Sequence, residues 1–590
     1  NKQVVTGLSK DFYRRLGAYY GKLEQWIFEP KVADSLFNDY IKRADVKVLY
    51  KYRITDVQLA NGYIKNITLE SSDGTKLGKS IAAKVFIDCT YEGDLMAKAG
   101  VSYIIGREDN KQYGETYNGV QLMKGHQFPD GVDPYKIKGD STSGLLWGIS
   151  PAALSSDGTG DKLVQAYNYR ICLTDNPANK IEITRPENYD STKYELLLRL
   201  FDAQPNKRKL NHYFIWSRMP NNKTDINNRG GFSTDMIGMN HNYPEASYEE
   251  RAEIIKAHKD YTQGLLYFYK TDPRVPQELR DEIQAWGYPK DEYTEDNHWS
   301  PQLYIRESRR MTGDYVMTQA HCEGRETVTD GIGMAAYTMD SHNCQRLLVK
   351  KDGKYIVKNE GNVEISGGLP YPISYRSIIP KEEECKNLLV PVCLSASHIA
   401  YGSIRMEPVF MVLAQSAAIA AAEAINTGSV QTVDIKKVQA LLHENPLLDD
   451  SFSEILIDDS ELDLSINNDW EVIKKQGGYG PTFLKSKVRN GSPVRFSPHM
   501  EHEGKYKVYT YYHMRKDISP AITYSISNGI DSWTRVIHKD SVRIEGQTTG
   551  EWIELGTYNF QKSSMPYIEI STGDTSGAVI ADAVLFIPVK

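Results

Sequence analysis

Hydrophobic residues recur first at helical and then at strand-like spacing in the early part of the chain. Residues 31–43 form an amphipathic pattern that predicts a helix. Asn61-Gly62 and Asp73-Gly74 predict hairpin turns between strands, because both residue pairs accept positive φ angles. The predicted strands are 46–50 (VKVLY), 53–59 (RITDVQL), 63–70 (YIKNITLE) and 84–88 (KVFID).

The middle of the chain, residues 126–360, is polar and irregular, with many Tyr, Asn and Pro residues. It predicts one long helix, whose apolar face carries Ile254, Ala257, Tyr261, Leu265 and Phe268.

The last third of the chain predicts a strand, a helix and a separate β domain. Residues 387–395 (NLLVPVCLS) predict a buried strand. A helix follows from Glu407, with Pro408 in its first turn and Gly428 just beyond its end. Residues 470–590 are short β-rich runs separated by Gly, Asn, Asp and Ser, which predicts an independent β-sandwich.

Composition indicates a globular protein of several domains: 590 residues, 40% hydrophobic and 25% charged, with a net charge of -7. A mildly acidic chain without a basic block has no electrostatic attraction for nucleic acid. We expect no membrane span, because Gln415, Ser416 and Glu423 interrupt the most apolar run, residues 409–425.

Two patterns that could suggest a ligand are weak. Residues 331–336 (GIGMAA) match the dinucleotide fingerprint GxGxxA, but 324–330 (GRETVTD) do not predict the buried strand that such a loop must follow. We therefore expect no phosphate-binding loop there. The six cysteines form no CxxC pair, and Asp340 with His342 would supply only two ligands, so we expect no metal site.

The stronger signal combines two distant segments. Val85–Ile87 is continuously apolar, as in a strand covered on both faces, and Asp88-Cys89-Thr90 follows at its carboxyl end, where α/β sheets bind ligands. The helix from Glu407 is rich in alanine, which permits close approach to a flat ligand or to another backbone, and its N-terminus favours an anionic group.

Four blocks of the sequence resemble FAD-dependent oxidoreductases of the glutathione-reductase-like fold, in a subfamily whose members often carry the name xanthan lyase. Residues 470–590 are similar to the golvesin-type β-sandwich. The blocks are VFIDCTYEGDLMAKAGVSYIIGRED (85–109), IRESRRMTGDYVMTQ (305–319), GGLPYPISYRSIIPK (367–381) and NLLVPVCLSASHIAYGSIRMEPVFMVLAQSAA (387–418).

The resemblance implies an α/β FAD-binding domain in two segments, residues 1–125 and 361–450, with an α+β substrate domain inserted at 126–360. A golvesin-like sandwich would occupy residues 470–590. The first strand and GxGxxG loop of the family should precede Asn1 and are absent from this chain. Either the chain is a fragment or mis-started product, or the protein has lost its pyrophosphate-binding loop, and we expect the affinity of the chain as given for FAD to be severely impaired.

The same resemblance implies which residues would meet FAD. The backbone of Ile54 would meet the adenine, and Asp88, Cys89 and Thr90 the ribose and pyrophosphate. The flavin ring would lie against Arg405, Pro408, Met411 and the start of the next helix, in which Gln415 and Ser416 fall in the usual GQAAG motif.

Three departures from the family pattern remove glycines. The usual ATG reads Cys89-Thr90-Tyr91, the usual AGR reads Pro391-Val392-Cys393, and the usual GQAAG reads AQSAA at 414–418. Each lost glycine removes a place where backbone can approach the cofactor closely.

The catalytic candidates are His398, Arg405 and Arg309. His398 lies in the block expected near the flavin and is either the base for the departing proton or a hydrogen-bonded structural histidine. Arg309, with Arg306 and Arg310, could hold a carboxylate or sugar hydroxyls, or could be a structural ion-pair partner.

These observations predict a flavoprotein oxidoreductase that acts on a sugar or another glycan-derived small molecule, in the periplasm or outside the cell. Two alternatives stay open: a polysaccharide lyase of the xanthan type, and a non-catalytic glycan-binding protein on a degenerate flavoprotein scaffold. Flavin content separates the first function from the other two.

Overall fold

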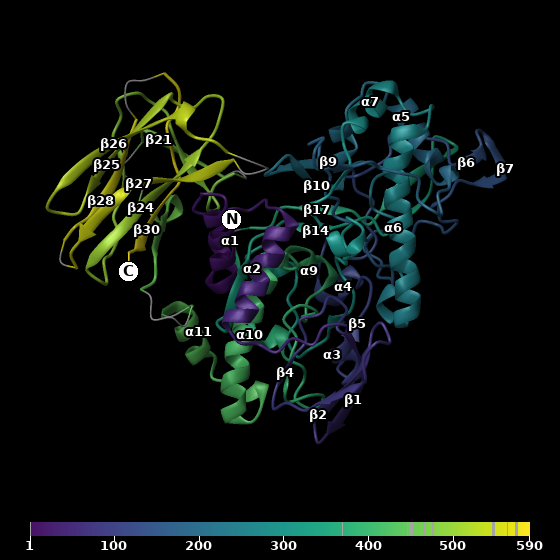
Figure 1. Ribbon diagram of the computed structural model, residues 1–590, viewed down its shortest axis with the longest axis horizontal. Coiled ribbons are helices and arrows are strands. Elements are labelled where there is room, and N and C mark those ends of the chain that lie inside the picture. Colours follow the sequence, from purple (N-terminus) through teal and green to yellow (C-terminus); the bar gives the residue numbers. More distant parts are fainter. Residues whose placement is uncertain are drawn as a thin grey trace. The chain divides into compact units, whose positions relative to one another are not determined.

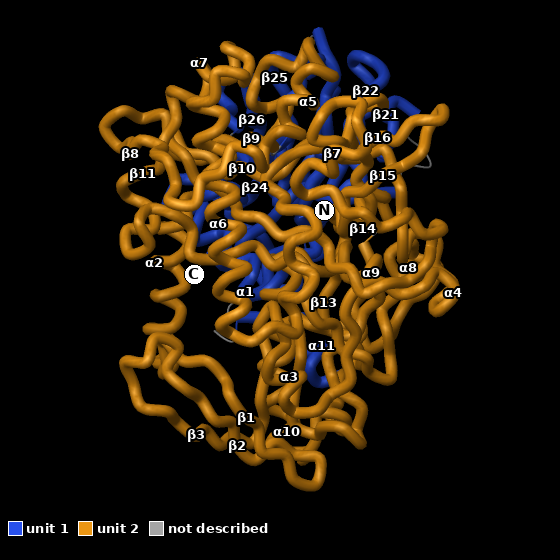
Figure 2. The backbone as a smooth tube through the Cα atoms, turned by 90° about the vertical axis from the view of Figure 1, so that its right-hand side faces the viewer, with its two compact units in different colours: residues 1–28, 436–590 blue, residues 29–435 orange. Residues whose placement is uncertain are grey.

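The chain divides into two compact units, coloured separately in Figure 2: Asn1–Phe28 with Lys436–Lys590 (unit 1), and Glu29–Ile435 (unit 2). The structure is a computed structural model. It describes residues 2–368, 370–444, 446–447, 452–463, 468–474, 477–544, 549–562, 564–572 and 576–589.

Unit 2 begins with the predicted helix and hairpin. Helix α2 (Pro30–Arg43) precedes an antiparallel sheet of β1 (Tyr52–Ala60), β2 (Tyr63–Ser71) and β3 (Lys79–Ile81). Ala60 pairs with Tyr63, so Asn61 and Gly62 form a two-residue turn. Their φ angles of 54° and 77° are the left-handed values that a type I′ turn requires.

The strand predicted at residues 46–50 is wrong, because the structure has no strand there. Val46, Val48 and Tyr50 are all exposed. A strand needs a partner for its backbone groups, and no described strand pairs with this segment. The run at residues 84–88 is also shorter than expected, since only Phe86–Ile87 forms a strand, β4.

β4 pairs in parallel with β19 (Leu388–Leu389), which lies some three hundred residues further along the chain. Phe86 lies opposite Leu388, and the pairing continues where the Asp88 N–H donates to the Leu389 carbonyl over 2.8 Å. Leu388 and Leu389 are fully buried, as expected for a parallel strand covered on both faces. This pairing joins the two predicted FAD-domain segments into one core.

Helix α10 (Glu407–Thr427) begins and ends where the sequence predicts. Pro408 lies in its first turn, and Gly428 ends it with a φ of 92°. It packs against β13 (Gly331–Ala335), where the Ser416 hydroxyl donates to the Ile332 carbonyl over 2.6 Å. Residues 331–335 of the GxGxxA match therefore form a strand and not a phosphate loop, as expected.

Of the described helices, α10 alone is long and apolar enough to cross a membrane, with a mean hydropathy of 1.6. Core helices of globular proteins share this length and composition, and 44% of its most apolar window is buried inside the protein. The finding is weak evidence for a membrane span.

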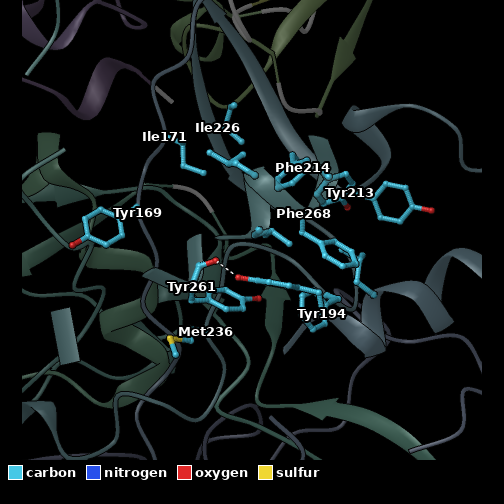
Figure 3. Packing of buried hydrophobic residues seen from close by; sticks show 14 of the residues in the cluster. Tyr169, Ile171, Tyr194, Tyr213, Phe214, Ile226, Met236, Tyr261 and Phe268 are labelled. Atoms are coloured by element: carbon cyan, nitrogen blue, oxygen red, sulfur yellow. Dashed lines mark hydrogen bonds between the residues drawn. The ribbon is translucent and has the colours of Figure 1, made fainter. Parts of the chain in front are cut away.

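The middle of unit 2 has a tyrosine-rich core around helix α6 (Tyr248–Thr271), the long helix that the sequence predicts (Figure 3). The Tyr194 hydroxyl donates to the Tyr261 carbonyl over 2.8 Å, and the Tyr261 hydroxyl donates to the Ser233 carbonyl over 2.6 Å. Buried phenols bring apolar area to the core, but each needs such a partner for its hydroxyl. Gly264 makes room, because a Cβ there would lie 2.3 Å from the Tyr194 hydroxyl.

The remaining elements of unit 2 are short. The helices are α3 (Asp94–Lys98), α4 (Asn110–Tyr113), α5 (Glu195–Ala203), α7 (Gln277–Gln284), α8 (Gln319–Cys322) and α9 (His398–Ile404). The two-stranded pairs are β5 (Tyr103–Ile104) with β12 (Arg310–Met311), β6 (Tyr135–Ile137) with β7 (Asp140–Leu145), β8 (Lys180–Ile181) with β11 (Tyr288–Pro289), β9 (Phe214–Met219) with β10 (Lys223–Asn228), β14 (Met339–Ser341) with β17 (Val363–Ile365), β15 (Gln345–Lys351) with β16 (Lys354–Glu360), and β13 with β18 (Tyr371–Ser374).

Unit 1 combines helix α1 (Gly7–Tyr19) and most of α11 (Ile435–Glu444) with an all-β domain (Figure 1). Phe496 and Ile568 from one sheet and Phe586 from another share one buried core. The antiparallel sheets have the orders β20-β30-β24-β27 (Ile455–Asp458, Ala583–Pro588, Gly504–His513, Gly550–Phe560), β21-β22-β29 (Trp470–Ile473, Phe483–Ser486, Ile580–Ala581) and β23-β28-β25-β26 (Val494–Phe496, Tyr567–Ser571, Ala521–Ser527, Ser532–His538).

One buried lysine ties the start of α2 to the middle of unit 2. The Lys223 ammonium on β10 donates to Glu29 over 2.6 Å, to Asp291 over 2.8 Å and to Glu292 over 2.5 Å. Burial alone would lower the pKa of Lys223, but the three carboxylates outweigh it and raise the pKa.

Lys223→Met should therefore destabilise unit 2 by roughly 3–5 kcal/mol, because it removes the buried ammonium that three carboxylates share. The free energy of unfolding in urea measures the effect. Lys351→Met, which removes an exposed partner of Asp130, is the control and should cost less than about 1 kcal/mol. Equal losses for the two variants would contradict this account.

Candidate functional site

Five buried or half-buried charged residues from distant segments form one connected group, the His342 cluster: Asp235, Arg306, Asp340, His342 and Arg405. Asp235 bridges Arg306 and His342, with 2.9 Å from Arg306 Nη2 to Oδ1 and 2.9 Å from His342 Nδ1 to Oδ2. On the other side, Asp340 Oδ2 lies 3.0 Å from Arg405 Nη2 and 3.7 Å from His342 Nε2.

A strand and a helix end bring this cluster together. Asp340 lies on β14 and His342 follows that strand, so the two side chains, two residues apart, leave the backbone toward the same face. Arg405 ends α9, which packs against β14. Gly402 permits this packing, because a Cβ there would lie 2.6 Å from the Asp340 carbonyl oxygen.

The electrostatics of the cluster favour a neutral His342. Burial lowers the pKa of His342, and Arg306 lowers it further. Burial opposes ionisation of Asp235, but Arg306 and then His342 outweigh it and hold the Asp235 pKa below its ordinary value. An ionised Asp235 that accepts from Nδ1–H leaves the Nε2 lone pair of His342 free to take a proton.

Two arginines of the cluster carry buried N–H groups without a hydrogen-bond acceptor among the described residues. They are Arg306 Nε and Arg405 Nε. A buried donor left without a partner is costly, so both positions suit a ligand that brings acceptor atoms.

Aromatic and polar side chains surround the cluster. The Tyr304 ring centroid lies 5.7 Å from the guanidinium group of Arg170 and 5.3 Å from that of Arg306.

His126 Nε2 lies 3.0 Å from Glu364 Oε1, and the His126 and His342 rings are 6.4 Å apart. Tyr337 is exposed and interacts electrostatically with Asp340 and Arg405.

The structure places His398, the base expected from the sequence, in a buried network around Glu307, which Gln165 connects to the backbone of His342. Its Nδ1 lies 2.8 Å from Glu307 Oε2, and its Nε2 lies 2.9 Å from the Ser341 hydroxyl. Arg310 Nε lies 2.7 Å from Glu307 Oε1 on the other side. Since both of its ring nitrogens have protein partners, His398 acts in this arrangement as a brace between α9 and β14.

Arg309, the second catalytic candidate, lies outside the cluster. Its guanidinium contacts Glu245 and Asp94, each at 2.8 Å, and donates to the Glu92 carbonyl over 3.0 Å. It thus anchors the turn that follows β4. Of the three catalytic candidates, Arg405 alone belongs to the His342 cluster.

The residues expected near the nucleotide lie in or beside the FAD-domain core. Asp88 is buried and accepts from Thr90 N–H over 3.0 Å and from Met96 N–H over 3.0 Å, so it holds the turn in place. Cys89 and Thr90 are exposed at the strand end. The Ile54 carbonyl accepts from the Tyr248 hydroxyl over 2.8 Å.

The predicted flavin-side residues follow one face of α10. Pro408, Met411 and Gln415 are half-buried, whereas Ser416 is buried against β13. Tyr91, in the place of a usual glycine, packs edge-on against Phe410 with ring centroids 6.2 Å apart. Its side chain therefore fills part of the space beside the helix N-terminus.

The described residues suit the flavin ring of FAD better than its pyrophosphate. The unpartnered N–H groups of Arg306 and Arg405 match the carbonyl and ring-nitrogen acceptors of a flavin. The turn after β4 offers less to a pyrophosphate, because Thr90 already accepts from Gly93 N–H and Asp88 from Met96 N–H.

Comparison with known families settles the relationship of the chain. Residues 1–442 match the family described as FAD dependent oxidoreductase. The chain belongs to this family. Residues 455–588 match the golvesin C-terminal domain, in agreement with the all-β architecture of that region. A search of curated proteins gave no match.

Solved structures show only low similarity. A xanthan lyase from Paenibacillus is 22% identical, with 23% of this chain and 13% of that chain covered and a TM-score of 0.20. An exo-β-1,3-galactanase from Phanerochaete chrysosporium is 14% identical, with 23% and 29% covered and a TM-score of 0.17. The C-terminal CBM6 of a laminarinase from Zobellia galactanivorans is 12% identical, with 23% and 99% covered and a TM-score of 0.18. TM-scores this low carry no argument about fold or function.

Sequence reasoning missed Asp235 and the role of His342. The spacing of Asp340 and His342 was visible, but it was considered only for a metal, and two ligands are too few. Nothing around Asp235 in the sequence marks it as a partner of His342, which lies more than a hundred residues away.

The Glu307 network has a predictable acid dependence. Burial opposes ionisation of Glu307, but His398 and then Arg310 outweigh it and lower its pKa from 4.5 to about 2. A carboxyl group whose pKa is lowered in the folded state stabilises the protein at pH values above its ordinary pKa. This stabilisation is lost as the pH falls toward the folded-state pKa.

We expect the stability difference between wild type and Glu307→Gln to shrink by roughly 3 kcal/mol as the pH falls from 5 to 2. Urea unfolding at several pH values measures it. The control is Glu382→Gln, at an exposed ion pair with Lys386. Its stability difference from wild type should not change with pH. A flat difference for Glu307→Gln would contradict the prediction.

Proposed function

We propose that this chain oxidises an alcohol group of a sugar or another glycan-derived small molecule, with FAD as the electron acceptor. Membership of the FAD dependent oxidoreductase family supports the cofactor. The observation that carries the proposal is the Asp235–His342 pair, in which a buried carboxylate orients an imidazole whose second nitrogen is free for a proton.

In the proposed reaction the O–H proton of the alcohol passes to His342 Nε2, while the carbon gives up its C–H bond and becomes a carbonyl. FAD, when bound, supplies the acceptor for the hydride and its two electrons. Asp235 keeps His342 in the required tautomer and stabilises the imidazolium that results. Arg405 orients Asp340, which lies beside Nε2 and attracts the proton toward that side.

The groups around the cluster suit a polyhydroxylated substrate. Asp340 and Glu364 offer acceptors for sugar hydroxyls, and Tyr304 and Tyr337 offer aromatic surface. Sugar hydroxyls both donate and accept, and their apolar C–H faces pack on tyrosine rings. This mixture supports a sugar over a purely apolar or purely anionic substrate.

The test uses the full chain after incubation with FAD. Flavin absorbance of the purified protein measures binding, and bleaching of that absorbance by a sugar under anaerobic conditions measures hydride transfer without any further acceptor. Release of an unsaturated uronate with no bleaching would support the polysaccharide lyase instead. Glycan binding with neither signal would support the non-catalytic alternative.

His342→Gln should lower the rate of flavin bleaching by roughly 10²–10⁴-fold, because it removes the base but keeps a polar side chain. Flavin absorbance should not change, since His342 acts on the substrate. The control is His258→Gln, a buried histidine whose Nδ1 contacts the Ile254 carbonyl in α6. An unchanged rate in His342→Gln would remove His342 from the mechanism.

A further inference from the structure

Three aspartates lie buried together in the golvesin-like domain, and none of them takes part in the proposed reaction. Asp458 ends β20, Asp459 follows it, and Asp582 lies between β29 and β30. Their exposed fractions are 1%, 2% and 0%, and one carboxylate oxygen from each lies within 4.8 Å of the others. We call them the Asp458 triad.

In each aspartate of the triad, one carboxylate oxygen accepts a hydrogen bond and the other has no hydrogen-bond partner among the described residues. Asp458 Oδ1 accepts from the Ser460 hydroxyl over 2.5 Å, Asp459 Oδ2 from the Thr482 hydroxyl over 2.8 Å, and Asp582 Oδ2 from Tyr479 N–H over 2.9 Å. The other three oxygens, Asp458 Oδ2, Asp459 Oδ1 and Asp582 Oδ1, are buried and have no hydrogen-bond partner among the described residues.

The triad also lacks the cation that a similar cluster has. Glu29, Asp291 and Glu292 in unit 2 surround the Lys223 ammonium. In the described part of the chain, no lysine or arginine forms an ion pair with the triad, and the imidazole of His513 contacts Asp582.

A cation near the triad is already engaged elsewhere. The Lys2 ammonium donates to the Tyr511 hydroxyl over 2.9 Å. A buried group of several carboxylates with so little positive charge is unfavourable unless a proton or a metal ion neutralises it.

The local backbone comes close to the triad. A Cβ on Gly480 would lie 2.1 Å from Asp458 Oδ2, so only glycine lets this loop lie against the carboxylate. Hard divalent cations take oxygen ligands from carboxylates, backbone carbonyls and water, and Ca²⁺ accepts six to eight of them in irregular geometry.

We propose that Asp458, Asp459 and Asp582 bind a divalent cation of the Ca²⁺ type through their three unpartnered oxygens. The site fastens the first strand of the domain to the last, because β20 pairs with β30 and Asp458 lies opposite Ala583. Its role is structural and independent of the proposed oxidation.

The proposal is tested on the full chain after removal of metals with a chelator. We expect native mass spectrometry to show one Ca²⁺ per chain, and saturating Ca²⁺ to raise the midpoint of the golvesin-domain unfolding transition by about 5 °C or more. Tb³⁺ should bind with sensitised luminescence from nearby tyrosines, and Ca²⁺ should displace it.

Asp459→Asn and Asp582→Asn should abolish the Ca²⁺-dependent shift and the Tb³⁺ signal. Asp459→Asn should also leave the metal-free domain at least as stable as wild type, since it removes carboxylate repulsion; a purely structural hydrogen-bonding role for Asp459 would instead make this variant less stable. The control is Asp517→Asn, at an exposed ion pair with Lys485 in the same domain, which should keep both responses.

Two results would overturn the proposal. Folded wild-type protein that binds no Ca²⁺ and shows no shift would mean that protons neutralise the triad. A larger shift with Mg²⁺ than with Ca²⁺ would exclude the assignment to a Ca²⁺-type cation, because Mg²⁺ demands smaller octahedral sites.

Discussion

Compensation of buried charge is the constraint on which this protein depends most. Carboxylates that are removed from water must find cations or hydrogen-bond donors, and a carboxylate that loses its partner costs several kcal/mol. Unit 2 meets this demand with Lys223 among three carboxylates, with Arg310 and His398 around Glu307, and with Arg306 and His342 around Asp235. Each group includes a partner from a distant segment, such as His398 beside Glu307, so these contacts also fix the tertiary arrangement.

The same constraint gives two buried histidines of unit 2 different hydrogen-bond environments. His398 and His342 lie on either side of Ser341, and each contacts a buried carboxylate through Nδ1. The difference lies at Nε2. In His398 it contacts the Ser341 hydroxyl, whereas in His342 it has no hydrogen bond to any described residue, and Asp340 is 3.7 Å away. This nitrogen is the one to which the proposed function assigns the proton transfer.

Local patterns in the sequence predicted the elements whose stability is local. The turn at Asn61-Gly62, the helix of residues 30–43 and the start and end of α10 depend on residues that are close in sequence, and all three were predicted correctly. The strand predicted at residues 46–50 was wrong because a strand depends on a partner as well as on its own residues, and no described strand pairs with it.

The candidate site was predicted only in part. Arg405 was chosen from the family resemblance and belongs to the His342 cluster, whereas Arg309 contacts Asp94 and Glu245 instead. Asp235 was not found, because a carboxylate in a polar segment has no signature until its partner is known. The Asp458 triad was missed for the same reason, since Asp582 is more than a hundred residues from the other two.

By itself, then, the sequence determined the family, the C-terminal golvesin-like domain and the local elements, because periodicity, turn residues and helix ends act over a few neighbouring positions. Only the tertiary structure decided which histidine has a free nitrogen and which carboxylates share a buried site. Those properties depend on the distances between segments, which cannot be read from the sequence. They also depend on how burial shifts the balance between charged and neutral forms of each side chain.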